Sequence, residues 1–432
     1  MELFKKLSMV VFIAMCIQSC SMEQKAVVTV GVSLDPLREN NYVHEKGEWT
    51  VMIYMPADND MEKAALKDLN EMEAADFDFE KNHVVALVDC NQYMEGYEGE
   101  WNGTRLYEVK KDKNGFHNRV VSLSVGCRDL GLSPKTESEL DMSDPDVLRK
   151  FVSSVKRYYP AEHYAFVMWG ECSGYSGNKS KARALAFDDS NLSYMSNKDF
   201  ALSLQKGMGG KFEILAMDSC FGSEIELLTE FEKCADYFIG MEGLQKTDGW
   251  DYYTLFSAVG KECSDGKTFG EYLLKSQDND NVALVDLSNV QVLCSEFDAF
   301  SKRLAESVHS KSMSKSIKAE ILDSDFCFTA YESTVNPVYV DIKSLARKYD
   351  GLDLISCIEK TSVSKNQKYG GIGVFFCNLD DSKNEIQEIP QDYVKSNDGS
   401  NCTFVENSEN YVFTKEKKGT LLDKLFGNYS SF

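Results

Sequence analysis

Residues Trp49–Met55 read WTVMIYM, and two similar runs follow at His83–Asp89 (HVVALVD) and His163–Trp169 (HYAFVMW). A fourth run lies at Phe212–Met217, and a fifth begins at Tyr237. A short, continuous apolar run is typical of a strand that is buried on both faces. Segments with helical spacing separate these runs. The alternation predicts an α/β fold, in which helices cover both faces of a mostly parallel sheet.

Three of the connecting helices carry clear signals. Met61–Glu73 has helical spacing, and Ser143-Asp144-Pro145 supplies a capping residue and a proline for a helix that runs to about Tyr158. Ser196 is expected to cap a helix that ends near Met208. Between them, Leu106–Val109 and Val120–Val125 are predicted to form a short hairpin excursion.

The pattern continues less regularly after residue 276. Strands are expected at Val282–Asp286, Val338–Ile342 and Gly371–Cys377, and a helix is expected at Val290–Ser307. We therefore divide the mature chain into a core over residues 48–275 and a C-terminal region over residues 276–432. This second region is either part of the same fold or an appended α/β subdomain.

The N-terminus carries an export signal. Lys5 and Lys6 precede an apolar run over Leu7–Ile17, which is too short to span a bilayer and is typical of a secretory signal peptide. Ile17-Gln18-Ser19-Cys20 resembles a bacterial lipobox, so residues 1–19 are the predicted signal and Cys20 the predicted lipidation site. Residues 20–47 are predicted to form a tether. The expected location is the bacterial cell envelope, in the periplasm or at the cell surface; an ordinary signal peptide with a chance cysteine is the alternative.

Composition excludes some partners. The 432 residues contain 47 Lys plus Arg and 69 Asp plus Glu, so the net charge is −22. Such a chain repels phosphate backbones and anionic membranes, which argues against nucleic acid and against bilayer contact other than through a lipid. It is compatible with basic peptides and divalent cations. The 13 cysteines form no C-x-x-C pair, so no metal site is predicted from their spacing.

Two predicted strand ends carry residues suited to chemistry. Glu171 and Cys172 follow the third apolar run, and Asp218 and Cys220 follow the fourth. In an open α/β sheet, sites form beyond the carboxyl ends of the strands. Cys220 would lie between a strand end and a helix start, where the helix N-terminus would lower the pKa of its thiol. A buried structural cysteine is the alternative at this position.

At this point the sequence resembles the clostripain-like cysteine peptidases, a family with the caspase and gingipain type of fold. The resemblance implies that Cys220 is the nucleophile, and that Asp218 and Asp248 line a pocket for the arginine or lysine after which the family cleaves. For Asp218, a helix-capping carboxylate is the alternative. The matching segments occur in order over about residues 48–290, and more weakly to about 377; they are Trp49–Met55, Ala57–Asp60, Asp68–Met72, Tyr164–Trp169, Ala186–Asp189, Met217–Glu224, Asp248–Trp250 and Val285–Ser288.

The catalytic histidine of the family is replaced. Its Trp-x-His-Gly-x-Gly segment matches Trp169 and Gly174, but the histidine position holds Glu171 and the next glycine position holds Cys172. The backbone N–H of Cys172 would still be available for an oxyanion site. The five histidines are poor substitutes. His83 and His163 begin predicted strands, and His44 lies in the predicted tether. His117 and His309 lie on excursions from the predicted sheet.

Three functions follow as alternatives. The first is a lipid-anchored pseudopeptidase that binds a basic peptide or a protein partner and cleaves it slowly or not at all. The second is an active Arg/Lys-specific cysteine endopeptidase with an unrecognised base. The third is a thiol site built from Cys172 and Cys220 on adjacent loops. No cofactor is required, although some members of the family use calcium, and the acidic residues near Asp58–Asp60 leave room for it.

Overall fold

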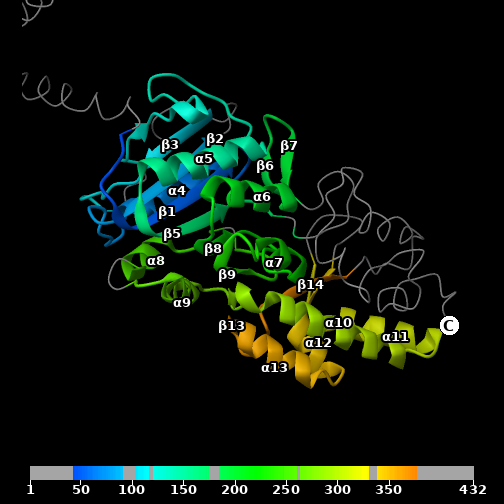
Figure 1. The fold of residues 1–432 in the computed structure, drawn as a ribbon. Helices are drawn as coiled ribbons and strands as arrows, with labels where there is room; N and C mark the ends of the chain where they lie inside the picture. The colour runs from blue at the N-terminus through cyan, green and yellow to red at the C-terminus, as the bar shows by residue number, and fades with distance from the viewer. Residues whose placement is uncertain are drawn as a thin grey trace, which may run out of the picture.

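The computed structural model describes residues 42–90, 103–115, 120–172, 174, 184–246, 248–259, 263–329 and 338–376. Within these residues, the central sheet has the strand order β13-β10-β9-β8-β5-β1-β2-β3-β4 (Figure 1). Its middle is parallel, as the alternation predicts, and the α/β fold class is confirmed. The parallel strands are β1 (Gly47–Ala57), β2 (His83–Cys90), β5 (Ala161–Trp169), β8 (Phe212–Asp218) and β9 (Ala235–Met241).

Antiparallel strands extend both edges of the sheet. β10 (Val282–Asp286) pairs with β9, and β13 (Ser362–Ser364) pairs with β10. On the opposite edge, β3 (Gly103–Glu108) pairs with β2, and β4 (Ser124–Val125) pairs with β3. The segments predicted as a hairpin excursion therefore belong to the main sheet. They do so because six residues of β3 pair with β2 and leave no break between the two.

Helices cover both faces. Successive side chains of β1 point to opposite faces of the sheet, so they pack into two separate hydrophobic clusters. Met52 and Tyr54 contribute to one cluster, while Val51 and Ile53 contribute to the other. The first cluster is covered by α5 (Pro145–Tyr158), α6 (Asn197–Met208), α7 (Ile225–Phe231), α10 (Val290–Ser307), α11 (Lys311–Leu322), α12 (Ile342–Lys348) and α13 (Leu352–Thr361). The second is covered by α4 (Glu62–Ala74), α8 (Tyr252–Val259) and α9 (Gly266–Ser276).

The predicted helix caps are present. The side chain of Asp144 accepts a hydrogen bond from Asp146 N–H at the start of α5, where Pro145 is the first helical residue. Ser196 accepts one from Asp199 N–H at the start of α6. Such a cap satisfies a backbone donor that the helix itself leaves unpaired and stabilises the helix by about 1 kcal/mol.

Smaller elements surround the sheet. β6 (Ala184–Asp188) and β7 (Ser193–Ser196) form a hairpin (Figure 1). A second sheet contains β11 (Cys327–Thr329), β12 (Val338–Asp341) and β14 (Gly373–Phe376). Two 3-10 turns lie at Arg128–Leu130 and Leu287–Asn289. A parallel bridge between Glu224 and Gly373 joins the second sheet to the loop after β8.

The chain is already packed on the fold before β1. His44, which the sequence analysis assigns to a tether, stacks on Tyr159 with ring centroids 4.3 Å apart, and its backbone N–H donates to Tyr158 O at 2.7 Å. The predicted signal, Cys20 and the start of the tether lie outside the described residues. Among the residues that are described, no helix is long and apolar enough to cross a bilayer.

Candidate active site

The register of two strands places Glu171 and Cys220 together. Trp169 of β5 pairs with Asp218 of β8, and the N–H of Gly170 donates to Asp218 O at 3.1 Å. Glu171 and Cys220 each follow this pair by two residues. Because the two strands are parallel, both side chains emerge at the carboxyl edge of the sheet on adjacent loops.

The backbone turns sharply directly after Cys220. Phe221 has a positive φ of 46°, a conformation that costs a bulky residue about 1–2 kcal/mol. Two contacts hold it: its N–H donates to Gly243 O at 2.9 Å, and its ring stacks on Tyr339 with centroids 4.5 Å apart. The turn therefore gives Cys220 a defined position beside the loop that follows β9.

The Cys220 thiol lies in an environment that disfavours the thiolate. It is half-buried, and its Sγ accepts a hydrogen bond from Gln245 N–H at 3.3 Å. Burial, with the nearby charges of Glu171, Asp218 and Glu224, raises the pKa of Cys220 to about 11. The expectation that a helix lowers this pKa is wrong, because α7 begins only at Ile225 and burial of the thiol, with the acidic neighbours adding to it, raises the pKa.

Glu171 and Cys172 point into different surroundings. The side chain of Glu171 is exposed, although desolvation and the charge of Asp60 raise the pKa of its carboxyl. Cys172 is buried; its Sγ lies 3.3 Å from Gly174 N and 3.8 Å from Phe221 O. Burial raises the pKa of the Cys172 thiol as well. Both cysteines are free thiols.

None of the four histidines in the described residues hydrogen bonds with Cys220. His163 lies at the amino end of β5, where its Nδ1 contacts Glu213 Oε1. His44 and His83 gather around Tyr159, also at the amino edge of the sheet. His309 is exposed between α10 and α11, and His117 lies outside the described residues.

Asp218 is buried at the end of β8 with three hydrogen-bond donors. Gln245 Nε2 donates to its Oδ1 at 2.8 Å, while Trp250 N–H and Tyr252 OH donate to its Oδ2 at 3.2 and 3.1 Å. Burial nevertheless raises the pKa of Asp218 to about 6. Gln245 therefore contacts both residues of interest, through its backbone at Cys220 and through its side chain at Asp218.

Asp68 of α4 is a second buried acid beside Asp218, and it was not predicted from the sequence as a site residue. Trp169 Nε1–H donates to its Oδ2 at 2.7 Å, and its Oδ1 has no hydrogen-bond partner in the described part of the chain. A Cβ at Gly249 would lie 3.2 Å from Asp218 Oδ2 and 3.5 Å from Asp68 Oδ2, so both acids face the same point. Burial and the charge of Asp218 raise the pKa of Asp68 well above its usual range.

Asp248, the other predicted pocket acid, has a different environment. Its side chain is exposed, on the loop between β9 and α8. Its negative charge contributes to the raised pKa of Lys67, which forms an ion pair with Glu71 at 3.1 Å. Asp248 therefore lies toward the surface, near a lysine, whereas the buried carboxylates are Asp68 and Asp218.

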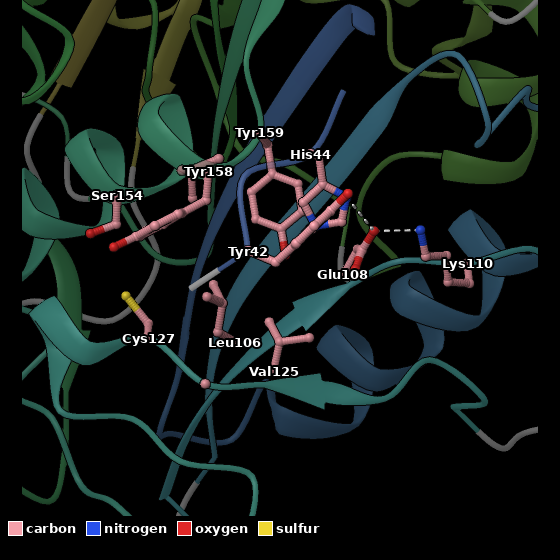
Figure 2. A pocket seen from close by; sticks show the side chains of 12 residues that line it. Tyr42, His44, Leu106, Glu108, Lys110, Val125, Cys127, Ser154, Tyr158 and Tyr159 are labelled. Atoms are coloured by element: carbon pink, nitrogen blue, oxygen red, sulfur yellow. Dashed lines mark hydrogen bonds and ion pairs between the residues drawn. The ribbon is translucent and has the colours of Figure 1, made fainter. Parts of the chain in front are cut away.

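A cavity of about 390 Å³ lies where the segments that precede β1 and β5 meet β3 and β4 (Figure 2). It is lined by Tyr42, His44, Glu108 and Tyr159, among others, and His44 faces Glu108 at 3.7 Å. Burial lowers the pKa of His44. The cavity contains none of the predicted site residues.

The comparisons with known proteins agree on one family. The family model described as Peptidase_C11, the clostripain family, matches residues 53–420. Clostripain of Hathewaya histolytica is 27% identical over 229 residues, which are 49% of this chain and 42% of clostripain. The chain thus aligns with less than half the length of that relative.

Solved structures share the fold. A secreted C11 cysteine protease of Bacteroides thetaiotaomicron, bound to an irreversible peptide inhibitor, superposes with a TM-score of 0.55 at 16% identity, covering 78% of this chain and 95% of that one. An inactive zymogen C11 protease of Parabacteroides distasonis gives a TM-score of 0.57 at 15% identity, covering 81% and 95%. At such identities the structures support the fold, and the family model, which spans most of the sequence, shows that this chain belongs to the clostripain family of cysteine peptidases.

Proposed function

We propose that this protein is a clostripain homologue that binds basic peptides, or a partner rich in basic residues, and cleaves them very slowly or not at all. The observation that carries the proposal is the environment of Cys220. Within the described residues, the hydrogen bond to its Sγ comes from a backbone N–H, the charged groups that act on the thiol are the carboxylates of Glu171, Asp218 and Glu224, and its pKa is raised to about 11.

Glu171 is a weak replacement for an imidazole. Desolvation raises the pKa of Glu171, but a carboxylate remains a much weaker base than the thiolate of a cysteine whose pKa is about 11, so proton transfer from Cys220 to Glu171 is unfavourable. Its negative charge also disfavours the thiolate, whereas an imidazolium would stabilise it and would protonate the leaving amine. Loss of a general base of this kind costs about 10²- to 10⁴-fold in rate.

The acids near Cys220 support binding of a basic side chain. Asp68 and Asp218 are buried, face the same point and form no ion pair within the described residues. Burial of uncompensated carboxylates is costly, and a guanidinium or ammonium group would offset the cost. The neutral side-chain amide of Gln245 donates a hydrogen bond to Asp218 Oδ1 in this structure. A cationic side chain would replace the amide as the donor to this oxygen.

The proposed location is the cell envelope, with a lipid on Cys20 as the anchor. The basic and apolar start of the sequence supports export, and so does the description of a related C11 protease as secreted. The lipobox-like segment that ends at Cys20 supports the anchor.

Binding and cleavage can be measured separately on one protein. Fluorescence polarisation with labelled peptides that contain one arginine, one lysine or one citrulline tests binding; we expect the arginine and lysine peptides to bind and the neutral citrulline peptide to bind at least tenfold more weakly. Asp218→Asn and Asp68→Asn should remove this preference, while Asp76→Asn, which neutralises an exposed acid after α4, should keep it.

Cleavage of Arg and Lys reporter peptides then separates the two main functions. We expect turnover no faster than that of a Cys220→Ala variant. Turnover that Cys220→Ala abolishes would show an active peptidase with another base. Equal affinity for the arginine and citrulline peptides would remove the basis of the binding proposal.

A further inference from the structure

Gln245 is the part-exposed member of the three donors that surround the buried carboxylate of Asp218. Its Nε2 donates to Asp218 Oδ1 at 2.8 Å. The other two donors, Trp250 N–H and Tyr252 OH, bond to Oδ2 at 3.2 and 3.1 Å and belong to fully buried residues. A ligand that approaches Asp218 Oδ1 from solvent therefore meets the Gln245 amide first.

The backbone around Gln245 is held in place, whereas its side chain can turn. Gln245 N–H donates to Cys220 Sγ at 3.3 Å, and Phe221 N–H donates to Gly243 O at 2.9 Å. The amide oxygen of Gln245 accepts a longer bond, at 3.3 Å, from the N–H of the next residue, Lys246. The amide can therefore leave the carboxylate by rotation of the side chain, while the loop stays closed over the thiol.

The space behind the amide lacks a donor. Asp68 Oδ1 is buried and has no hydrogen-bond partner in the described residues, because the Gln245 amide serves Asp218 alone. Gly249 has a φ of 65°, and a Cβ there would lie 3.2 Å from Asp218 Oδ2 and 3.5 Å from Asp68 Oδ2. The absence of a side chain at this position leaves free the point that both acids face. A buried carboxylate oxygen without a donor indicates that a ligand group belongs there.

We propose that Gln245 is a specificity-determining residue, whose amide closes the pocket for basic side chains and is displaced by the ligand. This inference rests on the proposed function, since it concerns the same two acids. A neutral donor would exchange one neutral group for another at Asp218 and gain little. A guanidinium or ammonium group brings a positive charge to Asp218 and Asp68 together, so it overcomes the competition. The amide thus sets a threshold that neutral side chains do not reach.

Two substitutions separate the hydrogen bond of Gln245 from its bulk. Gln245→Met keeps the length of the side chain and removes the donor, while Gln245→Ala removes both. At pH 8, where Asp218 with its pKa of about 6 is ionised, we expect the arginine peptide to bind about fivefold more tightly to each variant, since one competing hydrogen bond of ordinary strength is lost. The citrulline peptide should gain by the same factor, so that the ratio of the two affinities is unchanged. Fluorescence polarisation with the labelled peptides measures both.

Gln291→Ala is the matched control. Gln291 also donates to a carboxylate, Glu232 Oε2, at 2.6 Å, but it does so on the exposed face of α10. This variant should bind both peptides as the unaltered protein does.

The pH dependence of binding gives a readout that a purely structural role would not change. The Gln245 amide lowers the pKa of Asp218, so its removal should move the loss of arginine binding to a higher pH in both variants. The acidic neighbours of Asp218 on α4, Asp68 and Glu71, are the same in all of these proteins.

The outcomes distinguish this inference from the function on which it rests. Weaker or unchanged binding of the arginine peptide by both variants would overturn the competing role of the amide. Tighter binding by Gln245→Ala but not by Gln245→Met would contradict competition through the hydrogen bond. Equal affinity of the unaltered protein for the arginine and citrulline peptides would instead overturn the proposed function itself.

Discussion

Glu171 and Cys220 each lie two residues beyond Trp169 and Asp218, which are paired in register on adjacent parallel strands. The register therefore sets a carboxylate beside a thiol, and the charge of Glu171 contributes to the raised pKa of Cys220. A cation at the Glu171 position would have the opposite effect on the same thiol. The charge at position 171 would therefore set the pKa of the thiol without any change in the strands that hold the two residues.

Alkylation of Cys220 should report this pKa directly. Because only the thiolate reacts and its pKa is about 11, the rate of modification by iodoacetamide should rise about tenfold per pH unit from pH 7 to pH 10 without a plateau. Peptide mass mapping separates Cys220 from the other cysteines. Glu171→Gln should raise the rate at pH 8 several-fold, since a like charge is removed.

The exposed Glu80, replaced by Gln, serves as the control for a general change in charge. It should leave the pH profile unaltered. A plateau below pH 9 in the unaltered protein would mean that a group other than the Gln245 N–H stabilises the thiolate.

Asp218 should make the protein less stable as pH rises. Its pKa is about 6 in the folded state and near 3.9 when unfolded, so the folded state binds more protons between these values. The free energy of unfolding therefore falls as pH rises from about 4 to 6. Asp218→Asn removes this dependence and should gain up to about 3 kcal/mol relative to the unaltered protein above pH 6.

The asparagine can be accommodated. Its Oδ1 can accept from Trp250 N–H and Tyr252 OH, which both bond to one oxygen of Asp218, and its Nδ2 can donate to Gln245 after the Gln245 amide turns over. Urea unfolding of both proteins at pH 4, 5, 6 and 7 measures the difference. A difference that does not grow with pH would contradict a pKa of about 6 for Asp218 in the folded protein.

Lipidation should depend on Cys20. Mass spectrometry of the protein from a bacterial host with lipoprotein processing should find residues 1–19 removed and an acylated N-terminal cysteine. The Cys20→Ser protein should carry no lipid and should leave the membrane fraction. An unmodified N-terminus at another residue would contradict the anchor.

The sequence predicts the parallel core well because its strands are continuous apolar runs. β1, β2, β5, β8 and β9 all lie in such runs, and each run is bounded by a polar loop or helix. The edge strands β3 and β4 are short and mixed in composition, so only their pairing with β2 reveals that they belong to the sheet.

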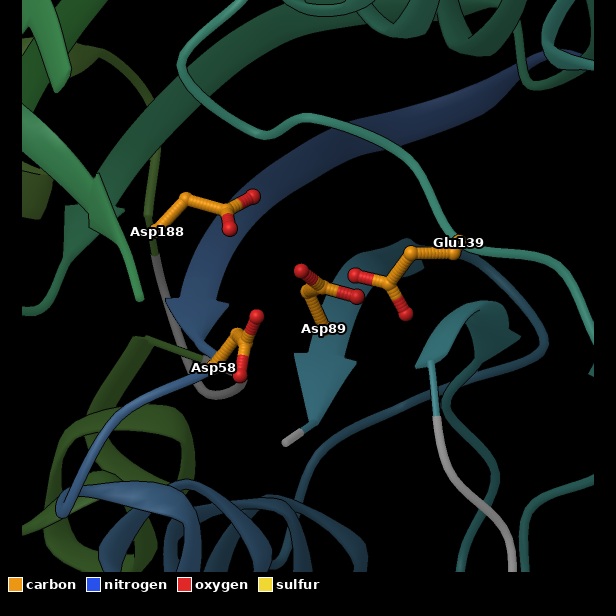
Figure 3. Close-up of side chains that lie close together, drawn as sticks. All are labelled: Asp58, Asp89, Glu139 and Asp188. Carbon is orange, nitrogen blue, oxygen red and sulfur yellow. The ribbon is translucent and has the colours of Figure 1, made fainter. Parts of the chain in front are cut away.

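A cluster of four carboxylates at the carboxyl edge of the sheet is much harder to predict (Figure 3). Asp58, Asp89, Glu139 and Asp188 are widely separated in sequence, and only the strand order 5-1-2 and the return of β6 bring them together. Asp68 is missed for another reason: a charged residue on a helix is usually exposed, whereas this one is buried under Trp169. Its position in the same helical segment as Leu66 and Leu69 is the signal that could have indicated burial.

Restoring a histidine should restore cleavage if Cys220 retains its role. The single variant Glu171→His is preferable to a double variant that also contains Cys172→Gly. The Cys172 side chain is buried, so its removal would leave a cavity and destabilise the fold. An imidazole at this position would lower the pKa of Cys220 and supply the missing proton transfer, which is worth about 10²- to 10⁴-fold in rate. We expect Arg and Lys reporter peptides to be cut by the Glu171→His protein and left intact by the unaltered one.

The chain itself is a second substrate for this experiment. Lys179, Lys181 and Arg183 lie between the Glu171 and Cys220 segments, outside the described residues. The unaltered protein should stay intact on long incubation with or without calcium, whereas Glu171→His should be cut in this segment. Glu171→Gln, which removes the charge without adding a base, should remain uncut, and the gain should vanish when Cys220→Ala is added. Self-cleavage of the unaltered chain that depends on Cys220 would instead show that another group acts as the base.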